Sequence, residues 1–229
     1  MIETKNTDPL LTYDLGLGVE AFSTRRNSVL PYPVLTAHQV HGTAIAVISG
    51  KMSRDDLQGF DALITDIPGL AIGVRTADCV PILLHDPVRH VVAAVHSGWR
   101  GTVQRIVTKV IAKMGVRYGT RPQDLRAVIG PAIGPDSFQV GEEVVRAFSD
   151  TGFPMDEIGS LRDPQPGKPM SGGHHIDLWQ ANRWLLGQAG IPENAIQVIG
   201  IDTYQSPDFF SARRETIACG RIINAIKLL

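Results

Sequence analysis

The sequence of 229 residues predicts an α/β domain with several β-strands and a few covering helices. Short apolar runs rich in β-branched residues, separated by Gly, Pro and Asp, occupy residues 61–95 and are typical of buried strands. The period then changes, because apolar residues from Val103 to Met114 recur with the spacing of one helix face. The sequence contains neither an internal repeat nor a linker between two cores, so we expect residues 1–229 to form a single domain.

Composition narrows the class of protein. Apolar residues make up 43% and charged residues 20% of the chain, which is ordinary for a soluble globular enzyme and argues against disorder. The net charge is −1 and no basic run forms a stripe, so nucleic acid is not an expected partner. The chain has only two cysteines and no signal peptide, which predicts a reduced, cytoplasmic protein. It has no apolar run of ~20 residues, so a membrane is not an expected partner.

The first half of the chain is expected to be mainly β. A short strand is predicted around Val19–Phe22, and two runs within Val34–Ile48 flank His41 and Gly42 as strand, turn and strand. Lys51–Gln58 is polar and predicts a surface loop or short helix. Further strands are predicted at Asp61–Thr65, Ala71–Arg75, Val80–Leu84 and Val91–Val95. The last of these is apolar at every position, which predicts that both of its faces are covered.

The second half mixes helices and strands. The apolar stripe from Val103 predicts a helix that ends at Gly115, and Asp177 is a good N-cap for a helix that ends at Gly190. Asp163–Gly173 is dense in Pro and Gly and is expected to be a mobile loop. The remaining predicted elements are a helix around Glu142–Phe148 and strands at Leu125–Ile129, Ile196–Ile199 and Arg221–Ile226.

Several motifs of known chemistry are missing from the sequence. The chain has no G-x-x-x-x-G-K-[ST] loop, no G-x-S-x-G elbow, no H-E-x-x-H and no zinc-deaminase signature. Gly16 and Gly18 loosely match a dinucleotide fingerprint, but no clear strand precedes them and no helical stripe follows. The candidates that remain are polar side chains at the ends of predicted buried strands.

One candidate set consists of His41, Cys79 and His96. His41 lies at the predicted turn in HQVHG, Cys79 precedes a predicted strand in TADC, and His96 lies in HSGWRG where a strand ends. A thiolate and two imidazoles form a good three-ligand zinc set and leave a fourth position for water or substrate. Structural alternatives stay open: a buried apolar Cys79, a His41 bonded to the backbone of its turn, and a His96 satisfied by nearby amides.

A second candidate cluster is FFSARR, which contains Phe209, Phe210, Arg213 and Arg214. Adjacent aromatics and adjacent arginines suit a planar or anionic ligand, because Arg offers a two-pronged donor to phosphate or carboxylate. A strand edge with exposed arginines and buried rings explains the same pattern without any ligand.

Two further polar residues accompany these candidates. Arg100, in GWRG, suits either the same anionic group or the surface of a helix N-terminus. Asp78, beside Cys79, suits a residue that orients a metal ligand, a general base, or the cap of a turn.

Seven separated segments occur in one order: HQVHG, DALIT, TADCVPILL, HSGWRG, IGPAIGPDSFQVG, FFSARR and GR. Together they resemble the YfiH-like family, often called laccase-domain or polyphenol oxidase proteins, from about Val34 to the C-terminus. The resemblance implies a layered α/β fold in which central mixed β-sheets are covered by helices. It also implies that His41, Cys79 and His96, each on the matching motif position, bind one metal ion, which is zinc or, in some descriptions, copper.

Two departures from the family pattern bear on specificity. The segment RRNSVLPYPV before the first motif is shorter than in many relatives. Asp202 precedes Thr203-Tyr204 where many relatives have Cys, and Ala212 stands where Tyr is common. If either position touches substrate, the substrate preference of this chain differs from that of those relatives.

The resemblance also implies a choice of activities. The family is associated with phosphorolysis of purine nucleosides, with adenosine deamination and methylthioadenosine cleavage, and with proposed copper-dependent phenol oxidation and cytosolic editing of peptidoglycan precursors. Seven histidines without a His-x-His pair are too few for a multicopper cluster, which disfavours a true laccase. We therefore expect a zinc-dependent purine nucleoside phosphorylase with associated adenosine deaminase activity, whose partners are a purine nucleoside and phosphate.

In this hypothesis an arginine holds phosphate near the ribose and an aromatic ring lies against the purine. The expected catalytic residues are Cys79, Asp78 and Arg100, and the expected substrate-binding residues are Arg213, Arg214, Phe209, Phe210 and Trp99. The alternatives are a hydrolase acting on a cell-wall precursor, a copper-dependent polyphenol oxidase, and a binding module without catalysis. Turnover that depends on metal distinguishes an enzyme from the binding module.

Overall fold

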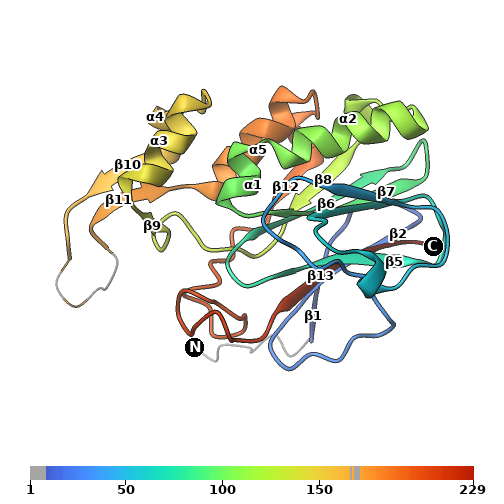
Figure 1. The fold of residues 1–229 in the computed structure, drawn as a ribbon, viewed down its shortest axis with the longest axis horizontal. Coiled ribbons are helices and arrows are strands. Elements are labelled where there is room, and N and C mark those ends of the chain that lie inside the picture. The colour runs from blue at the N-terminus through green and yellow to red at the C-terminus, as the bar shows by residue number, and fades with distance from the viewer. Residues whose placement is uncertain (1–8, 166, 168–170) are drawn as a thin grey trace.

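Helices, a six-stranded sheet and a four-stranded sheet form three stacked layers, which Figure 1 shows from the side. The structure is a computed structural model and describes residues 9–165, 167 and 171–229. Helices α2 and α5 lie above the larger sheet, and the smaller sheet lies beneath it. The layered α/β class is confirmed, with one mixed sheet covered by helices and a second sheet that is antiparallel throughout.

The six-stranded sheet is the central layer and is mixed. Its two outer pairs, β12 with β8 and β3 with β4, are parallel, and the pairs between them are antiparallel. The prediction of buried strands between residues 61 and 95 is confirmed for the three that enter this sheet. In spatial order the strands are β12 (Ile196–Val198), β8 (Arg126–Ile129), β6 (Val80–Asp86), β7 (Val91–Ser97), β4 (Ala62–Thr65) and β3 (Ile45–Ile48).

The four-stranded sheet joins the two ends of the described chain. All of its pairs are antiparallel, and the C-terminal strand lies between two early strands. The short strand β1 was not predicted, because three residues carry no readable alternation. In spatial order the strands are β1 (Leu10–Thr12), β2 (Val19–Thr24), β13 (Ile222–Leu228) and β5 (Ala71–Thr76).

The position of strand β7 between two cores explains why residues 91–95 are all apolar. Val91, Ala93 and Val95 belong to the core between the central sheet and the helices. Val92 and Ala94 belong to a second core between the two sheets. Successive side chains of a strand point to opposite faces, so a strand between two cores needs apolar residues at both parities. The prediction that both faces are covered is confirmed.

Three helices cover the central sheet: α1 (Trp99–Val103), α2 (Ile106–Tyr118) and α5 (Leu178–Gln188). The predicted stop at Gly115 is wrong, because α2 continues to Tyr118 and ends at Gly119, whose φ of 72° allows the left-handed cap. The predicted cap of α5 is confirmed, since the Asp177 carboxylate accepts the Gln180 backbone N–H at 2.9 Å.

A lateral extension carries most of the elements that the sequence did not reveal (Figure 1). Helix α3 (Glu142–Asp150) confirms its prediction, whereas the other elements of the extension were missed because they are short and polar. Of the predicted mobile loop Asp163–Gly173, residues 166 and 168–170 lie outside the described residues. The missed elements are β9 (Gln139–Val140), α4 (Met155–Ile158), β10 (Gly159–Arg162) and β11 (Gly173–Ile176).

The segment before His41 is not the strand that the sequence predicts. Only isolated bridges occur there, at Leu35 and His38, so this part of the prediction is wrong. The polar segment after β3 contains a 3-10 turn at Arg54–Asp56, as one of the two alternatives predicts. Further 3-10 turns lie at Pro122–Asp124 and Glu193–Ala195. Within the described part of the chain, no helix has the length and apolar character that crossing a membrane requires.

Candidate metal centre

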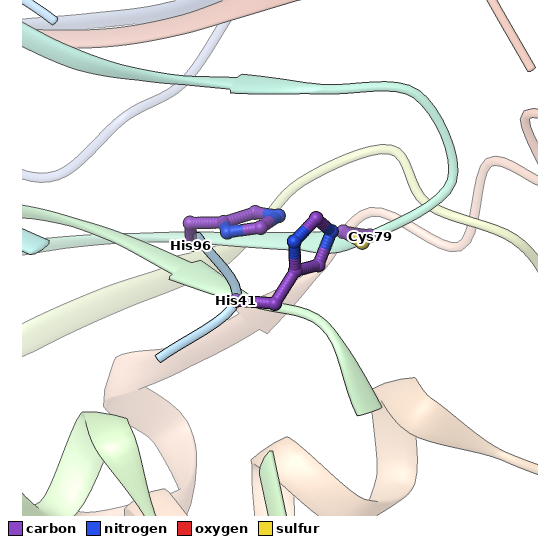
Figure 2. Close-up of side chains that lie close together, drawn as sticks. All are labelled: His41, Cys79 and His96. Carbon is purple, nitrogen blue, oxygen red and sulfur yellow. The ribbon is translucent and has the colours of Figure 1, made fainter. Parts of the chain in front are cut away.

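His41, Cys79 and His96 converge on one point, as Figure 2 shows. One nitrogen of each imidazole and the Cys79 sulfur all lie within 4.8 Å of one another. The rings of His41 and His96 meet edge to face, with their centroids 4.9 Å apart. His96 is buried on β7, Cys79 is half-buried directly before β6, and His41 is exposed on its turn. The fold therefore brings together all three predicted ligands.

The register of β6 and β7 places Cys79 beside Gly98. Pro81 pairs with His96 and Val80 with Ser97, so the residues one step further along each strand lie next to each other. A Cβ atom added at Gly98 would lie 2.9 Å from the Cys79 sulfur. Glycine is therefore required in HSGWRG because the thiol occupies the space that any other side chain would fill.

Asp61 is a central residue of the site that our sequence reasoning did not single out. Its carboxylate accepts the His96 Nδ1–H at 2.8 Å and the backbone N–H groups of His41 and Gly42 at 2.9 and 2.7 Å. The same carboxylate thus orients the His96 ring and fixes the turn on which His41 lies. A signal was present, since Asp61 is the one charged residue at the head of the apolar run DALIT.

The polar groups of the site change one another's proton affinity. Burial raises the pKa of the Cys79 thiol, but the imidazoles of His96 and His41 outweigh burial and lower it to about 6. Burial lowers the pKa of His96, but the Cys79 thiolate and the Asp61 carboxylate outweigh burial and raise it to about 9. Both shifts favour a thiolate, which is the form of cysteine that binds a metal.

The donor set fits a metal ion. Zinc–ligand bonds of about 2.0–2.3 Å keep tetrahedral ligand atoms roughly 3.5 Å apart, so movements of about 1 Å complete the site. The bond from His96 Nδ1 to Asp61 leaves His96 Nε2 to face the other two donors. Three ligands from one protein leave a position open, as catalytic zinc sites require.

The three ligands form part of the wall of a cavity of about 460 Å³, which is large enough for a small substrate. Three arginines, Arg54, Arg75 and Arg221, also line it, and none of the described residues that line it is Asp or Glu. Our sequence reasoning assigned none of these arginines to the site. Arg75 lies four residues before Cys79 and Arg221 lies in the GR motif, but their convergence depends on the pairing of β5 with β13.

The FFSARR cluster lies outside the residues that line this cavity. The Arg214 guanidinium donates to the carbonyls of Thr203, Tyr204, Ser206 and Phe209 at 2.6–2.8 Å. The structure therefore gives Arg214 backbone partners in place of the anion that we expected. Arg214 has these partners because residues 202–209 fold so that several of their carbonyls converge on its guanidinium.

The other members of FFSARR also have protein partners. Arg213 donates to the Gln139 carbonyl at 3.0 Å and lies 5.6 Å from the centre of the Phe138 ring. Phe209 is fully buried, so it offers no face to a purine in this structure. Phe210 packs against Gly220, and the Arg26 guanidinium lies over its ring, 4.3 Å from the ring centre.

Asp78 connects the FFSARR segment to the metal ligands. Its carboxylate accepts the Thr203 hydroxyl and the Arg213 backbone N–H, each at 2.7 Å. Its φ of 91° is in the left-handed region, so the turn before Cys79 is strained and depends on these bonds. Both carboxylate oxygens have partners, which favours the role of orienting Cys79 over that of a general base.

Three remaining sequence candidates lie at the surface or in a turn. The Arg100 side chain is exposed and lies 4.4 Å from the centre of the half-buried Trp99 ring. Neither residue lines the cavity with the metal ligands. Asp202, which departs from the family pattern, accepts the Ser137 hydroxyl at 2.6 Å and the Tyr204 backbone N–H at 2.9 Å. Asp202 therefore supports a turn in this structure.

Comparison with known proteins agrees with the motifs. A family model described as multi-copper polyphenol oxidoreductase laccase matches residues 20–229. The chain therefore belongs to this laccase-domain family, the one that its motifs resemble. Among the described residues, one group of three or more His, Cys, Asp or Glu side chains is close enough to hold a metal, namely His41, Cys79 and His96.

Relatives of this chain carry the names of nucleoside enzymes. A purine nucleoside phosphorylase from Bacteroides thetaiotaomicron is 41% identical, over 92% of this chain and 82% of the relative. Adenosine deaminase RL5, from an unknown prokaryotic organism, is 39% identical, over 96% of this chain and 80% of the relative. The crystal structure of Bacillus licheniformis hypothetical protein YfiH superimposes with a TM-score of 0.80 and 29% identity, covering 92% of this chain and 93% of that chain. The relatives support an enzyme, and the His–Cys–His set supports metal binding.

Proposed function

We propose that this protein is a zinc-dependent purine nucleoside phosphorylase that cleaves inosine and adenosine with phosphate. Methylthioadenosine is a further proposed substrate, and deamination of adenosine is a proposed second activity of the same site. The observation that carries the proposal is the His–Cys–His set, which lies in the wall of a cavity. Arginines line this cavity, and none of the described residues that line it is acidic. The names of relatives at 41% and 39% identity support the same substrate class.

The proposed reaction defines what the residues must do. A phosphate oxygen attacks C1′ of the ribose while the bond from C1′ to the purine nitrogen breaks, and the base leaves with the electron pair and takes up a proton. The products are the free base and ribose 1-phosphate. Holding the anion in line with C1′ and stabilising charge supply most of the catalysis in such a reaction.

The chain's own residues meet these needs in different ways. His41, Cys79 and His96 would hold the zinc, which when bound supplies a Lewis acid to polarise the substrate. Asp61 keeps His96 in the tautomer that presents Nε2 to the site. In this proposal Asp78 is a positioning residue for Cys79, because its carboxylate is occupied by Thr203 and the Arg213 backbone.

The purine requires an apolar contact. No aromatic side chain other than histidine lines the cavity among the described residues, so Trp99, Phe209 and Phe210 are not the proposed contacts in this conformation. Ile217 lies on the cavity wall and is 76% exposed. An exposed aliphatic side chain at a ligand cavity is a natural contact for a base. We propose that Ile217 covers one face of the purine.

A copper-dependent polyphenol oxidase is the second candidate, and the description of the family model favours it. Two imidazoles and one thiolate also resemble a blue-copper ligand set. One copper exchanges one electron at a time, whereas complete reduction of dioxygen to water takes four. The His–Cys–His group therefore fits this candidate less well than it fits nucleoside chemistry.

The test measures turnover of inosine and adenosine, with and without phosphate, by protein of known metal content. Wild type, His41→Ala and Cys79→Ala are compared with His174→Ala, a histidine of β11 that does not line this cavity. Chromatography separates free base, nucleoside and deaminated product. We expect phosphate-dependent release of free base by wild type and His174→Ala, and a loss of at least ~100-fold in the two ligand variants.

Two outcomes contradict the proposal. Absence of base release by protein that carries one equivalent of zinc would reject phosphorolysis and direct attention to a hydrolase acting on cell-wall precursors. Consumption of oxygen by the copper-loaded protein with a phenol, together with no nucleoside turnover, would establish the oxidase. Conversion of adenosine to inosine without phosphate reports on the deaminase activity separately.

A further inference from the structure

Arg54, Arg75 and Arg221 come from three distant parts of the sequence and line one cavity together with the metal ligands. Arg54 begins the 3-10 turn after β3, Arg75 lies on β5, and Arg221 directly precedes β13. We call these three residues the arginine cluster. Arg75 pairs with Ile223 across the two strands, which places it close to the start of β13.

Two members of the cluster lack a counter-charge. Neither the Arg54 nor the Arg75 guanidinium forms a hydrogen bond or ion pair with any residue that the structure describes. The Nε atom of Arg54 is buried and has no acceptor, which is unfavourable for a charged donor. A buried donor without a partner, on a side chain that lines a cavity, indicates a ligand that supplies the acceptor.

The third member presents a charge in a fixed position. Arg221 donates to the carbonyls of Ile217, Cys219 and Gly220, so its guanidinium is held by its own loop. Carbonyl partners leave the positive charge uncompensated. The three cations also affect one another, since burial and then the charges of Arg54 and Arg221 hold the pKa of Arg75 below its usual range.

The backbone of Arg75 is fixed by a side chain from the metal-site segment. The Gln39 amide accepts the Arg75 backbone N–H at 2.8 Å and donates to the Arg75 carbonyl at 2.9 Å. Gln39 lies two residues before His41, so the same segment positions both a metal ligand and the backbone of Arg75. The cluster and the metal centre are thus built as parts of one cavity.

We propose that the arginine cluster is a subsite for a phosphate group, held beside the metal centre with its oxygens accepting from Arg54 and Arg75. Phosphate fits better than carboxylate, because it carries up to two charges and offers several acceptors to forked guanidinium donors. This assignment deepens the proposed phosphorylase function and moves phosphate from Arg100, Arg213 and Arg214 to residues on the cavity wall. The group is free phosphate in phosphorolysis or the phosphate of a phosphorylated substrate.

The test is calorimetric titration of the zinc-loaded protein with inorganic phosphate in the absence of nucleoside. Arg75→Gln and Arg54→Gln are compared with Arg117→Gln, which changes an exposed arginine of α2 that does not line the cavity. We expect the dissociation constant for phosphate to rise about 10- to 100-fold in the two cluster variants, as loss of a charged hydrogen bond predicts. Arg117→Gln should stay within about twofold of wild type. Thermal unfolding verifies that each variant is folded.

A second titration with a nucleoside 5′-monophosphate identifies the source of the phosphate group. Tighter binding of inorganic phosphate, with sensitivity to Arg75→Gln, assigns the subsite to free phosphate. Binding of the monophosphate alone, with the same sensitivity, assigns it to a phosphorylated substrate. Equal phosphate affinity in wild type and both cluster variants, or no binding of either ligand by wild type, would overturn the assignment.

The kinetic readout keeps this inference separate from the proposed function. If inosine is cleaved, Arg75→Gln should raise the KM for phosphate about 10-fold or more while kcat at saturating phosphate changes little. Phosphate binding that depends on Arg75, without any cleavage of nucleosides, would retain the subsite and reject the phosphorylase. Cleavage of inosine with an unchanged KM for phosphate in Arg75→Gln would retain the phosphorylase and reject the subsite.

Discussion

Arg214, in the C-terminal loop (residues 202–221), and Arg54 and Arg75, on the cavity wall, have opposite surroundings. Arg214 donates to four backbone carbonyls and forms an ion pair with Glu215. The guanidinium groups of Arg54 and Arg75 have no hydrogen-bond or ion-pair partner among the described residues. All three carry the same charge. Their partners therefore decide which arginine stabilises the fold and which is available to a ligand.

The same division applies to the acidic and metal-binding groups. Asp61 and Asp78 use both carboxylate oxygens within the protein and act by positioning others. His41 and Cys79 face the cavity with donor atoms that can bind a metal. Groups whose bonding is complete within the protein define the geometry, and groups with free donors or acceptors define the chemistry.

Arg214→Gln should have the largest effect on stability. The substitution removes charged hydrogen bonds from several loop carbonyls, so we expect the free energy of unfolding to fall by about 3 kcal/mol. Arg75→Gln should leave the free energy of unfolding within about 0.5 kcal/mol of wild type or raise it, because the substitution removes a cation that Arg54 and Arg221 repel. Urea denaturation of wild type and both variants provides the measurement. Equal losses of stability in the two variants would remove the distinction between the two groups of arginines.

The outcome for Arg214 also shows what the sequence could predict. FFSARR indicates a cluster of cations and rings, and in the structure this segment lies close to the turn before Cys79. Its partners could not be predicted, because four carbonyls from residues 203–209 converge only in the folded loop. A cation in sequence looks the same whether its partner is a ligand or a carbonyl group.

Most strands of the two large sheets could be predicted for a different reason. Strands such as β7 lie between two cores, so burial of both faces leaves an uninterrupted apolar run in the sequence. Strands β10 and β11 lie in the lateral extension and have the sequences GSLR and GHHI, which carry no such pattern. Their strand structure depends on pairing with each other and with β9. The helix end predicted at Gly115 was wrong because tertiary packing also decides where a helix ends. Burial of Met114 outweighs the low helix propensity of Gly115.

Asp61→Asn should have an intermediate effect, which is expressed at the metal centre. The asparagine amide replaces an acceptor with a donor that opposes either the His96 Nδ1–H or the N–H groups of His41 and Gly42. We expect zinc affinity to fall about 10- to 100-fold, the range typical for loss of a carboxylate that orients a metal-binding histidine. Competition with a chelating dye measures the affinity.

The control for this substitution is Asp66→Asn, an exposed residue directly after β4. It removes the same charge from the neighbourhood of the same strand without contacting a metal ligand, so zinc affinity should change by less than about twofold. If Asp61→Asn matches this control, then the bond from Asp61 to His96 has no role in metal binding, and the division between positioning and ligand-binding groups fails at this site.

Glu215→Gln should have the smallest effect, and its dependence on pH distinguishes it. Arg26, the Ser211 backbone N–H and Arg214 hold the pKa of Glu215 at about 2, below its ordinary value of 4.5. Because the folded-state pKa is lowered, the ionised carboxylate stabilises the fold fully above pH 4.5, and this contribution is lost as the pH falls towards 2. Glu215 lies near the surface, so we expect a loss of less than about 1 kcal/mol at pH 7.

The measurement compares the free energies of unfolding of wild type and Glu215→Gln at pH 7 and pH 3. The difference between the two proteins should be smaller at pH 3, because the Glu215 carboxylate of the unfolded wild-type chain is then mostly protonated, and folding must release this proton. Glu142→Gln breaks an exposed ion pair with Arg146 on α3 and should show a difference near zero at both values. A difference that grows as the pH falls would mean that Glu215 is more easily ionised in the unfolded chain. In that case the ion pairs with Arg26 and Arg214 would not stabilise the C-terminal loop, and Arg214 would act through its carbonyl partners alone.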